Sequence, residues 1–242
     1  MNDKTPFLTA DWRYLAMLNY EIDPALLAPY VPAGTALDFW RGRCYVSVVG
    51  FLFLNTRLRG LPIPGHINFE EVNLRFYVGR QAADGWRRGV VFIKELVPRR
   101  AIAAVARWVY NENYQALPMR HRLAVNGAVD LAYEWKFNGR WQGLQARAQG
   151  TAQPLDPESE ATFITEHYWG YARQRDGSTV EYQVAHPSWR VWEVKEYGLD
   201  CDVAELYGHE FVAPLQNAPT SVFVAEGSAV AVYGGNVLAQ SG

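Results

Sequence analysis

Runs of β-branched and aromatic residues recur along this chain of 242 residues. Such residues suit the pleated, half-buried surface of a sheet, so these runs predict strands. We expect strands at residues 44–54, 69–78, 89–97, 131–137, 179–185, 189–194 and 221–225. Two-residue signals that favour a positive φ predict tight turns at Asp84-Gly85, Asn138-Gly139 and Asp176-Gly177. Repeated hairpins imply antiparallel pairing.

Helix signals are few by comparison. Asp23-Pro24 and Asp156-Pro157 each combine a capping residue with a proline suited to the first turn. Between the strands expected at 89–97 and 131–137, apolar residues recur with the spacing of one buried helical face. These signals, with a weaker one near the C-terminus, predict helices at 25–29, 99–111, 157–166 and 202–207. We expect a single α+β domain over residues 1–242, dominated by a curved antiparallel sheet.

Composition excludes several classes of protein. The chain is 49% hydrophobic and 20% charged, which is typical of a globular protein. Its 23 Lys and Arg against 25 Asp and Glu argue against a nucleic-acid partner. Two cysteines exclude a disulfide scaffold. The longest apolar stretch, residues 45–54, is too short for a membrane span, so we expect a cytoplasmic protein without a membrane partner. Homo-oligomerisation stays open.

The familiar cofactor and metal motifs are absent from the sequence. It has no phosphate-binding loop, no glycine fingerprint for a dinucleotide and no nucleophile elbow. His209-Glu210 lacks the second histidine of the helical zinc motif, and the five histidines are scattered. We therefore expect neither a cofactor nor a metal.

The strand predicted at 69–78 carries the first candidate for chemistry. Because side chains alternate between the faces of a strand, Glu71, Asn73 and Arg75 share one face and apolar residues share the other. An acid, an amide and a base in one row suit the lining of a polar cavity. The alternative is a solvent-facing strand with a weak ion pair.

Two further candidates lie at the two ends of the helix predicted at 99–111. Arg99 and Arg100 stand at its start, where cations oppose the helix dipole; they mark an anion site or simply reach into solvent. Arg107, Tyr110 and Asn113 belong to a segment dense in polar and aromatic residues that suits a small ligand. The alternative for that segment is a helix C-terminus followed by a hydrated loop.

Glu166 and His167 are adjacent in the sequence. Neighbouring side chains diverge on a helix or a strand, so the two do not form a ready acid–base pair. The aromatic residues that follow them favour a packing role.

Several longer motifs resemble a known family. They are FLTADWR at 7–13, MLNY at 17–20, DPALL at 23–27, NFEEVNLRFY at 68–77, VPR at 97–99, YNENY at 110–114 and EHYWGY at 166–171. Together they resemble the YqjF-like family of uncharacterised bacterial proteins, in the acetoacetate decarboxylase-like superfamily. The resemblance covers nearly the whole chain. It implies a curved antiparallel sheet closed into a cone around a central cavity.

The resemblance also implies an activity, but the sequence departs from its motif. The superfamily decarboxylates a β-keto acid through a lysine Schiff base, in a segment reading Arg-Glu, a few residues, then Pro-Lys-Lys. The similar segment here runs from Lys94-Glu95 to Pro98-Arg99-Arg100, with arginine in place of both lysines. Arginine stays protonated and cannot form the imine. Lys94 matches the arginine of that motif, and Glu71 is similar to an acidic residue that lines the superfamily's cavity.

These observations lead to one hypothesis and two alternatives. We expect a cavity that binds a small, anionic carboxylic or keto acid, with a lyase-type reaction that uses no Schiff base. Glu71 is the expected acid or base. The expected substrate-binding residues are Asn73, Arg75, Arg99, Arg100, Arg107, Tyr110 and Asn113. One alternative is a binding or sensing module with the same cavity and no catalysis. The other is Schiff-base catalysis by Lys94, which requires Lys94 to face the cavity on the same side as Glu71.

Overall fold

The computed structural model describes residues 5–101 and 111–238. Seven strands form a closed barrel, because the strand at one end of the row, β13, also pairs with β15 at the other. In ring order these are β13 (Thr179–Ala185), β12 (Trp169–Arg173), β6 (Gly85–Val97), β5 (Phe69–Ala82), β3 (Tyr45–Leu58), β1 (Leu8–Glu21) and β15 (Ser221–Val232). All neighbours in the ring are antiparallel except β6 and β12, which are parallel.

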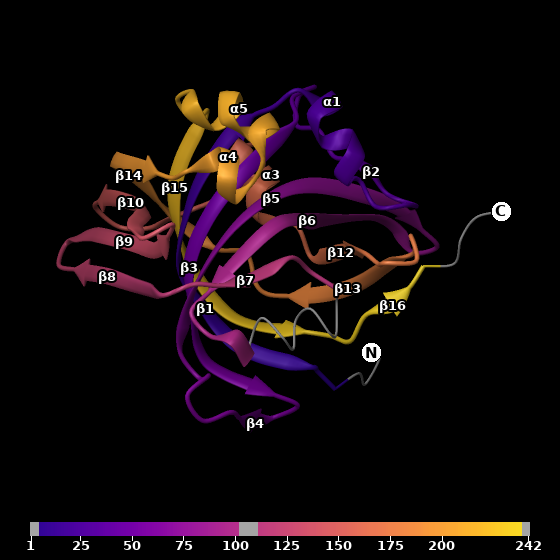
Figure 1. Cartoon of the computed structure of the whole chain (residues 1–242), viewed down its shortest axis with the longest axis horizontal. Coiled ribbons are helices and arrows are strands. Elements are labelled where there is room, and N and C mark those ends of the chain that lie inside the picture. The colour runs from indigo at the N-terminus through magenta and orange to yellow at the C-terminus, as the bar shows by residue number, and fades with distance from the viewer. Residues whose placement is uncertain (1–4, 102–110, 239–242) are drawn as a thin grey trace.

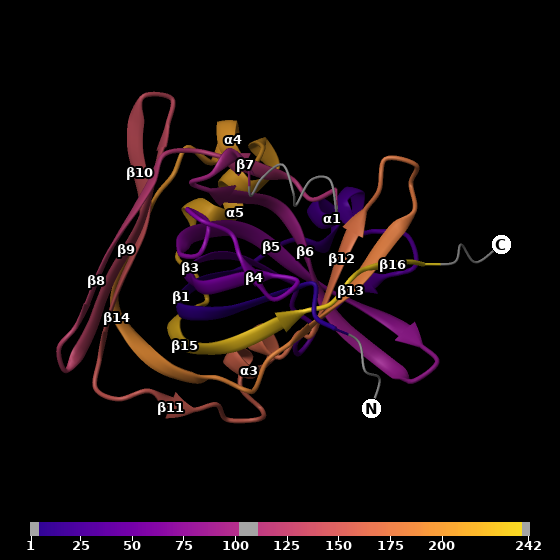
Figure 2. The ribbon, with the colours of Figure 1, turned by 90° about the horizontal axis from the view of Figure 1, so that it is seen from below.

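A second sheet continues from β15 and stands beside the barrel (Figure 2). Its strands are β14 (Arg190–Asp200), β10 (Arg140–Gln149), β9 (Ala128–Phe137) and β8 (Met119–Val125). Five two- or three-residue strands complete the sheet: β2 (Ala36–Leu37), β4 (Leu61–Pro62), β7 (Tyr114–Ala116), β11 (Gln153–Pro154) and β16 (Asn236–Val237).

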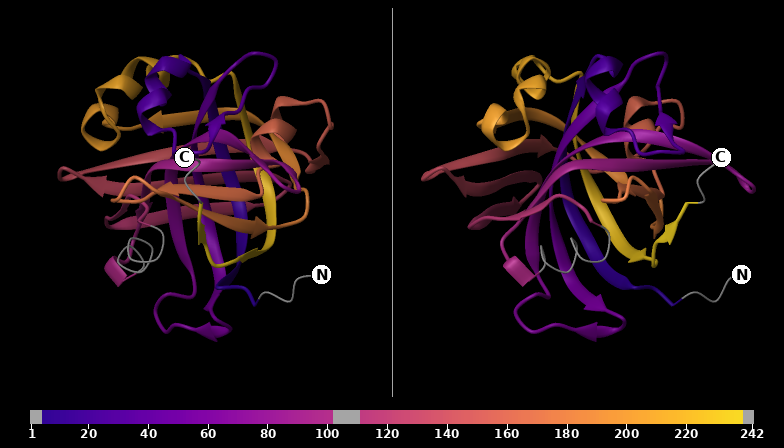
Figure 3. Two further views of the ribbon diagram at one scale, coloured as in Figure 1. Left: turned by 90° about the vertical axis from the view of Figure 1, so that its right-hand side faces the viewer. Right: turned by 45° about the vertical axis from the view of Figure 1, so that its right-hand side comes forward.

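The described helices are short. They are α1 (Pro24–Leu27), α3 (Glu160–Thr165), α4 (Val203–Leu206) and α5 (Val212–Gln216), with 3-10 turns η1 (Ala28–Tyr30) and η2 (His209–Phe211). Helices α1, α4 and α5 gather at one end of the barrel, and β4 lies at the other end (Figures 1 and 3). None of the described helices has the length and apolar character needed to cross a membrane.

Strand alternation separates two apolar cores. On β5, Val72, Leu74 and Phe76 point outward into the core between the barrel and the second sheet. Phe69 and Tyr77 point inward, where aromatic side chains fill part of the barrel. The inner face also carries the polar residues of β5, so the alternation predicted for this strand is confirmed.

The predicted hairpins are confirmed. Ala82 pairs with Gly85 at the end of the β5–β6 hairpin. Asn138 and Gly139, with φ of 49° and 77°, form the turn between β9 and β10. Gly177, with φ of 83°, lies in the turn between β12 and β13. In each case the sequence supplied a residue that tolerates the left-handed conformation at little cost.

The pattern underestimated the extent of the sheet. It did not predict β1, β8, β10 or β12, and β14 and β15 continue well beyond their predicted ends. Strand β1 mixes polar and apolar residues and has a bulge near Tyr14, whose φ is 54°, so its alternation breaks partway along.

The helix predictions fare similarly. Asp23 caps α1 by accepting from the backbone amide of Ala25 over 2.9 Å, and Asp202 caps α4. Helix α3 begins at Glu160 rather than at 157, because Ser159 is its N-cap while Asp156 closes the preceding turn. Most of the helix predicted at 99–111 lies outside the described residues.

Candidate functional site

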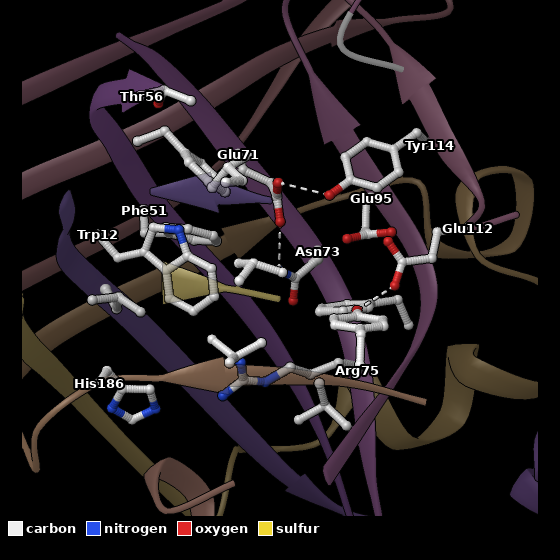
Figure 4. A pocket seen from close by; sticks show the side chains of 18 of the residues that line it. Trp12, Phe51, Thr56, Glu71, Asn73, Arg75, Glu95, Glu112, Tyr114 and His186 are labelled. Carbon is white, nitrogen blue, oxygen red and sulfur yellow. Dashed lines mark hydrogen bonds between the residues drawn. The ribbon is translucent and has the colours of Figure 1, made fainter. Parts of the chain in front are cut away.

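The interior of the barrel holds a cavity of about 220 Å³. Its walls are mainly aromatic, with contributions from Trp12, Phe51, Phe92, Trp169 and Trp189. Polar side chains converge on it from β5, β6 and the segment at 112–114 (Figure 4). A mostly apolar cavity with a few polar groups is the usual form of a small-molecule site.

The polar row of β5 lies inside this cavity. Glu71, Asn73 and Arg75 are 2%, 1% and 8% exposed, and all three line the cavity. The Asn73 side-chain amide donates to Glu71 Oε1 over 3.0 Å. The hydroxyl of Tyr114 donates to Glu71 Oε2 over 3.3 Å. The structure thus places the row on a cavity wall and not toward solvent.

Two more glutamates meet Glu71 at this end of the cavity (Figure 4). Glu95 comes from β6, and Glu112 accepts a hydrogen bond from Tyr182 on β13. Burial raises the pKa of Glu71 to about 8 and that of Glu112 to about 7. Burial, and then the neighbouring Glu112, raise the pKa of Glu95 well above its usual range. This acidic cluster, Glu71, Glu95 and Glu112, therefore carries protons near neutral pH.

Arg75 is a buried cation on the same wall. Its guanidinium lies over the ring of Tyr77 at 5.6 Å, and its Nη2 donates a long hydrogen bond to Met17 Sδ over 4.0 Å. Among the described residues it forms no salt bridge, and its Nε has no hydrogen-bond partner. A buried arginine without a carboxylate is costly, so it marks a place where an anion is favoured.

A histidine and an aspartate form a third group. Asp38 Oδ2 accepts from Arg88 Nε over 2.7 Å and faces His167 Nε2 at 3.3 Å. Hydrogen bonds from His167 and Arg88 hold the pKa of Asp38 low despite its burial. Burial lowers the pKa of His167 to about 4, so its ring is neutral. With the proton on Nε2, the buried Nδ1 keeps its lone pair and has no partner among the described residues.

Several polar atoms around the cavity share this unpartnered state. Within the described residues, the buried atoms without a hydrogen bond include Trp12 Nε1, Thr56 Oγ1, Asn73 Oδ1, Arg75 Nε, Glu95 Oε2 and His167 Nδ1. Native proteins leave few buried polar groups unpaired. Six such atoms around one cavity are the pattern expected of a site that a ligand completes.

Lys94 does not belong to this site. A bulge in β6 between its pairings with Leu74 and Arg75 makes both Ile93 and Lys94 point away from the barrel interior, and Glu95 points in. Lys94 is half-buried on the outer face, and no lysine lines the cavity within the described residues. Schiff-base catalysis requires Lys94 to face the cavity beside Glu71, and the structure does not meet this condition.

The other predicted residues fall in different places. Arg99 and Arg100 are exposed just after β6 and do not line the cavity. Asn113 is exposed, and its amide donates to the Ile93 carbonyl over 2.9 Å, which fixes the backbone beside β6. Arg107 and Tyr110 lie outside the described residues.

The sequence reasoning missed Glu95, Glu112, Tyr114 and His167 as cavity residues. Glu112 and Tyr114 alternate within a motif that the resemblance had already singled out, and this spacing was an available signal. Glu95 could not be found in this way, because it points into the cavity only as a result of the bulge, and no residue type in the sequence predicts a bulge there. Within the described residues, no group of three or more His, Cys, Asp or Glu has the geometry to hold a metal ion.

Comparison with solved structures identifies the fold. The acetoacetate decarboxylase of Legionella pneumophila matches with a TM-score of 0.64 and 14% identity, over 99% of this chain and 90% of that one. The enduracididine biosynthesis enzyme MppR, solved with pyruvate, matches with a TM-score of 0.67 and 14% identity, over 98% and 92%. An acetoacetate decarboxylase-like enzyme from Sphingomonas wittichii gives 0.65 and 12%, over 97% and 94%. The fold is acetoacetate decarboxylase-like.

Sequence comparison identifies the family. The uncharacterized protein YqjF of Bacillus subtilis is 27% identical over 182 residues, which are 74% of this chain and 72% of that protein. The family model DUF2071, described as an uncharacterized conserved protein, matches residues 9–229. The predicted resemblance is thereby confirmed, and the chain belongs to the DUF2071 family.

Proposed function

We propose that this protein binds a small carboxylic or keto acid inside the barrel, with Arg75 holding the carboxylate. The observation that carries this proposal is the buried guanidinium of Arg75 on the cavity wall, which has no carboxylate partner among the described residues. A carboxylate fits the planar fork of arginine through two parallel hydrogen bonds. The cavity is smaller than the usual pocket for a drug-sized molecule, so the ligand is small. The pyruvate bound to MppR, a structural neighbour, supports the same class of ligand.

Glu71 is the proposed acid and base of a lyase-type reaction. Its pKa of about 8 leaves it mostly protonated near neutral pH but able to give up the proton. The ionised minority of Glu71 removes a proton from the carbon next to the ligand's carbonyl: the C–H bond breaks, its electron pair forms the enolate, and the proton stays on Glu71 until it is returned to carbon. The enolate formed on proton removal would be stabilised by the positive charge of Arg75. No imine is needed, which agrees with a described cavity lining that contains no lysine.

A thermal-shift screen tests the binding. The ligands are pyruvate, acetoacetate, lactate and acetate. A ligand at a hundredfold excess over its Kd adds about 2.7 kcal/mol of stability. We expect pyruvate or acetoacetate to stabilise the wild type and Arg75→Gln to abolish the effect. The double variant Arg99→Gln/Arg100→Gln is the matched control, because both side chains are exposed and off the cavity. A shift that survives in Arg75→Gln, or no shift with any acid, overturns the proposal.

Catalysis is separated from mere binding by a second measurement. Proton NMR follows exchange of the pyruvate methyl hydrogens for deuterium in heavy water. We expect the wild type to accelerate this exchange and Glu71→Gln to lose the acceleration by about two orders of magnitude or more. Binding without exchange or turnover would instead favour the alternative, a ligand-binding or sensing module. The absence of a lysine from the described cavity lining is the feature that keeps this alternative in view.

A further inference from the structure

The acidic cluster is larger than a single acid–base step requires. Glu71 alone serves the proposed proton transfer, yet Glu95 and Glu112 line the same end of the cavity. The side chains meet in Figure 4, and the charge of Glu112 contributes to the raised pKa of both Glu71 and Glu95. Glu71 and Glu95 are buried and Glu112 is half-buried, so within the described cavity lining three carboxyl groups stand against one arginine, Arg75.

A second observation points to a ligand at this end. Asn73 is 1% exposed, and its Nδ2 is used by Glu71, which leaves Oδ1 as a buried acceptor without a donor among the described residues. Glu95, also 1% exposed, has Oε2 in the same state. The two residues are directly opposite each other on β5 and β6. An amide oxygen can only accept, so whatever completes Asn73 must bring an N–H or O–H group.

We propose that the ligand carries a basic nitrogen group, an ammonium or a guanidinium, which binds among Asn73 Oδ1, Glu95 and Glu112 while the carboxylate lies on Arg75. The inference rests on the proposed function for the carboxylate and adds the chemistry of the other end of the molecule. A cation with several N–H donors satisfies the unpaired acceptors, and its charge favours the ionised form of the carboxyls that hold protons in the empty cavity.

The arrangement sets the form of such a ligand. In Figure 4 Asn73 lies between the Arg75 guanidinium and the carboxyls of Glu95 and Glu112, so the two charged ends are on opposite sides of it. A short chain with an acid at one end and a basic group at the other spans these positions. The aromatic walls pack against the methylene groups between them. The ligand class is therefore an ω-amino or ω-guanidino acid, with or without a keto group.

A matched ligand series tests the inference by isothermal titration calorimetry on the wild type. The probes are butyrate, 4-hydroxybutyrate, 4-aminobutyrate, 4-guanidinobutyrate and butylamine. We expect at least one of the two zwitterions to bind about tenfold or more tightly than butyrate. Equal or weaker binding of both zwitterions overturns the inference. A preference for 4-hydroxybutyrate over both also overturns it, because a hydroxyl would then be the missing donor.

Variants locate the basic group. Glu95→Gln and Glu112→Gln keep the side-chain shape and remove the charge, so each should cut the zwitterion's advantage over butyrate about tenfold while butyrate binding stays. Glu70→Gln is the control: Glu70 neighbours Glu71 on β5 but faces His121 outside the cavity. An advantage that persists in both cavity variants contradicts the proposal. If either fails to fold, the wild-type series still decides.

The same experiment separates the two proposals. If butyrate binds through Arg75 but the nitrogen adds nothing, the inference fails and the proposed function stands. If butylamine binds and no acid does, the carboxylate site on Arg75 fails. The two failures give different patterns of affinity across the ligand series, so one cannot be mistaken for the other.

Discussion

Asn73 and Glu95 face each other across β5 and β6, and both side chains point into the barrel. One residue earlier on β6, Lys94 pairs with Leu74 and points outward. A bulge at this position turns the strand, so an acid and not a lysine enters the cavity. This local choice decides which chemistry the barrel can support.

The first expectation concerns Lys94 itself. Incubation with pyruvate and borohydride should leave no reduced adduct on Lys94, because that side chain lies on the outer face of β6. Peptide mass spectrometry checks this directly. Lys94→Met should retain the binding and exchange of the wild type within about twofold, as expected for a residue that does not contact the ligand. An adduct mapped to Lys94 would show that the strand rearranges in solution.

The second expectation is a pH dependence caused by Glu71. Its folded pKa of about 8 lies above the ordinary value of 4.5, so the folded state holds its proton after the unfolded chain has lost its own. Stability contributed by this group is therefore lost as the pH rises from 4.5 toward 8. At pH 8 the free energy of unfolding of Glu71→Gln should exceed that of the wild type by roughly 1–3 kcal/mol, and it should depend less on pH.

Denaturant unfolding at pH 5.5 and pH 8 measures the effect. Glu134→Gln is the control, because the hydrogen bond from Arg120 lowers the pKa of Glu134. A lowered pKa places its pH dependence at acidic pH, so this variant should show no change in slope between 5.5 and 8. A Glu71→Gln variant that is no more stable than the wild type at pH 8 would contradict a protonated, buried Glu71.

The third expectation concerns His167. Its pKa of about 4 is below the ordinary value of 6.5, so on acidification the unfolded chain binds a proton before the folded protein does. Stability is thus lost as the pH falls from 6.5 toward 4, and His167→Gln should remove part of that loss. Nitrogen NMR of the imidazole should show a neutral ring with the proton on Nε2 down to about pH 5. A ring already charged at pH 6 would exclude this arrangement.

Asp38→Asn tests the partner of that histidine. The change removes the carboxylate that accepts from Arg88 and faces His167, and it leaves a half-buried guanidinium unpaired. We expect a loss of about 2–4 kcal/mol in unfolding free energy. Asp84→Asn is the comparison: Asp84 pairs with Arg87 at an exposed turn, so this change should lower the free energy of unfolding far less than Asp38→Asn does. Equal losses in the two variants would mean that the Asp38–Arg88 pair contributes no more to stability than the exposed Asp84–Arg87 pair.

The fourth expectation concerns the parallel junction that closes the barrel. Trp169 pairs with Gly89 across β12 and β6, and a Cβ on Gly89 would come within 2.6 Å of the Trp169 carbonyl oxygen. The backbone there cannot move without separating the two strands, so Gly89→Ala should lower the free energy of unfolding by about 1–3 kcal/mol. Gly234→Ala, where a Cβ meets nothing within 4 Å, is the matched control and should be near neutral. Thermal melts of both variants compare them, and equal Tm values would contradict the tight junction.

The sequence by itself determined the class of fold and one wall of the site. Strand alternation placed Glu71, Asn73 and Arg75 on one face, and the structure puts that face inside the barrel. Turn chemistry at Asn138-Gly139 fixed a hairpin through local φ alone. These features depend on residues close together in the chain, and local rules describe them well.

Tertiary structure decided the rest of the site. Because of the bulge, Glu95 and not Lys94 points into the cavity. The bulge follows from the register between β5 and β6, and that register depends on pairing along the whole length of the two strands. Barrel closure brings Glu112 to Tyr182 and Asp38 to His167, across 70 and 129 positions of chain. Local sequence cannot foresee such meetings, because closing those distances costs entropy that only the packed core of the folded barrel repays.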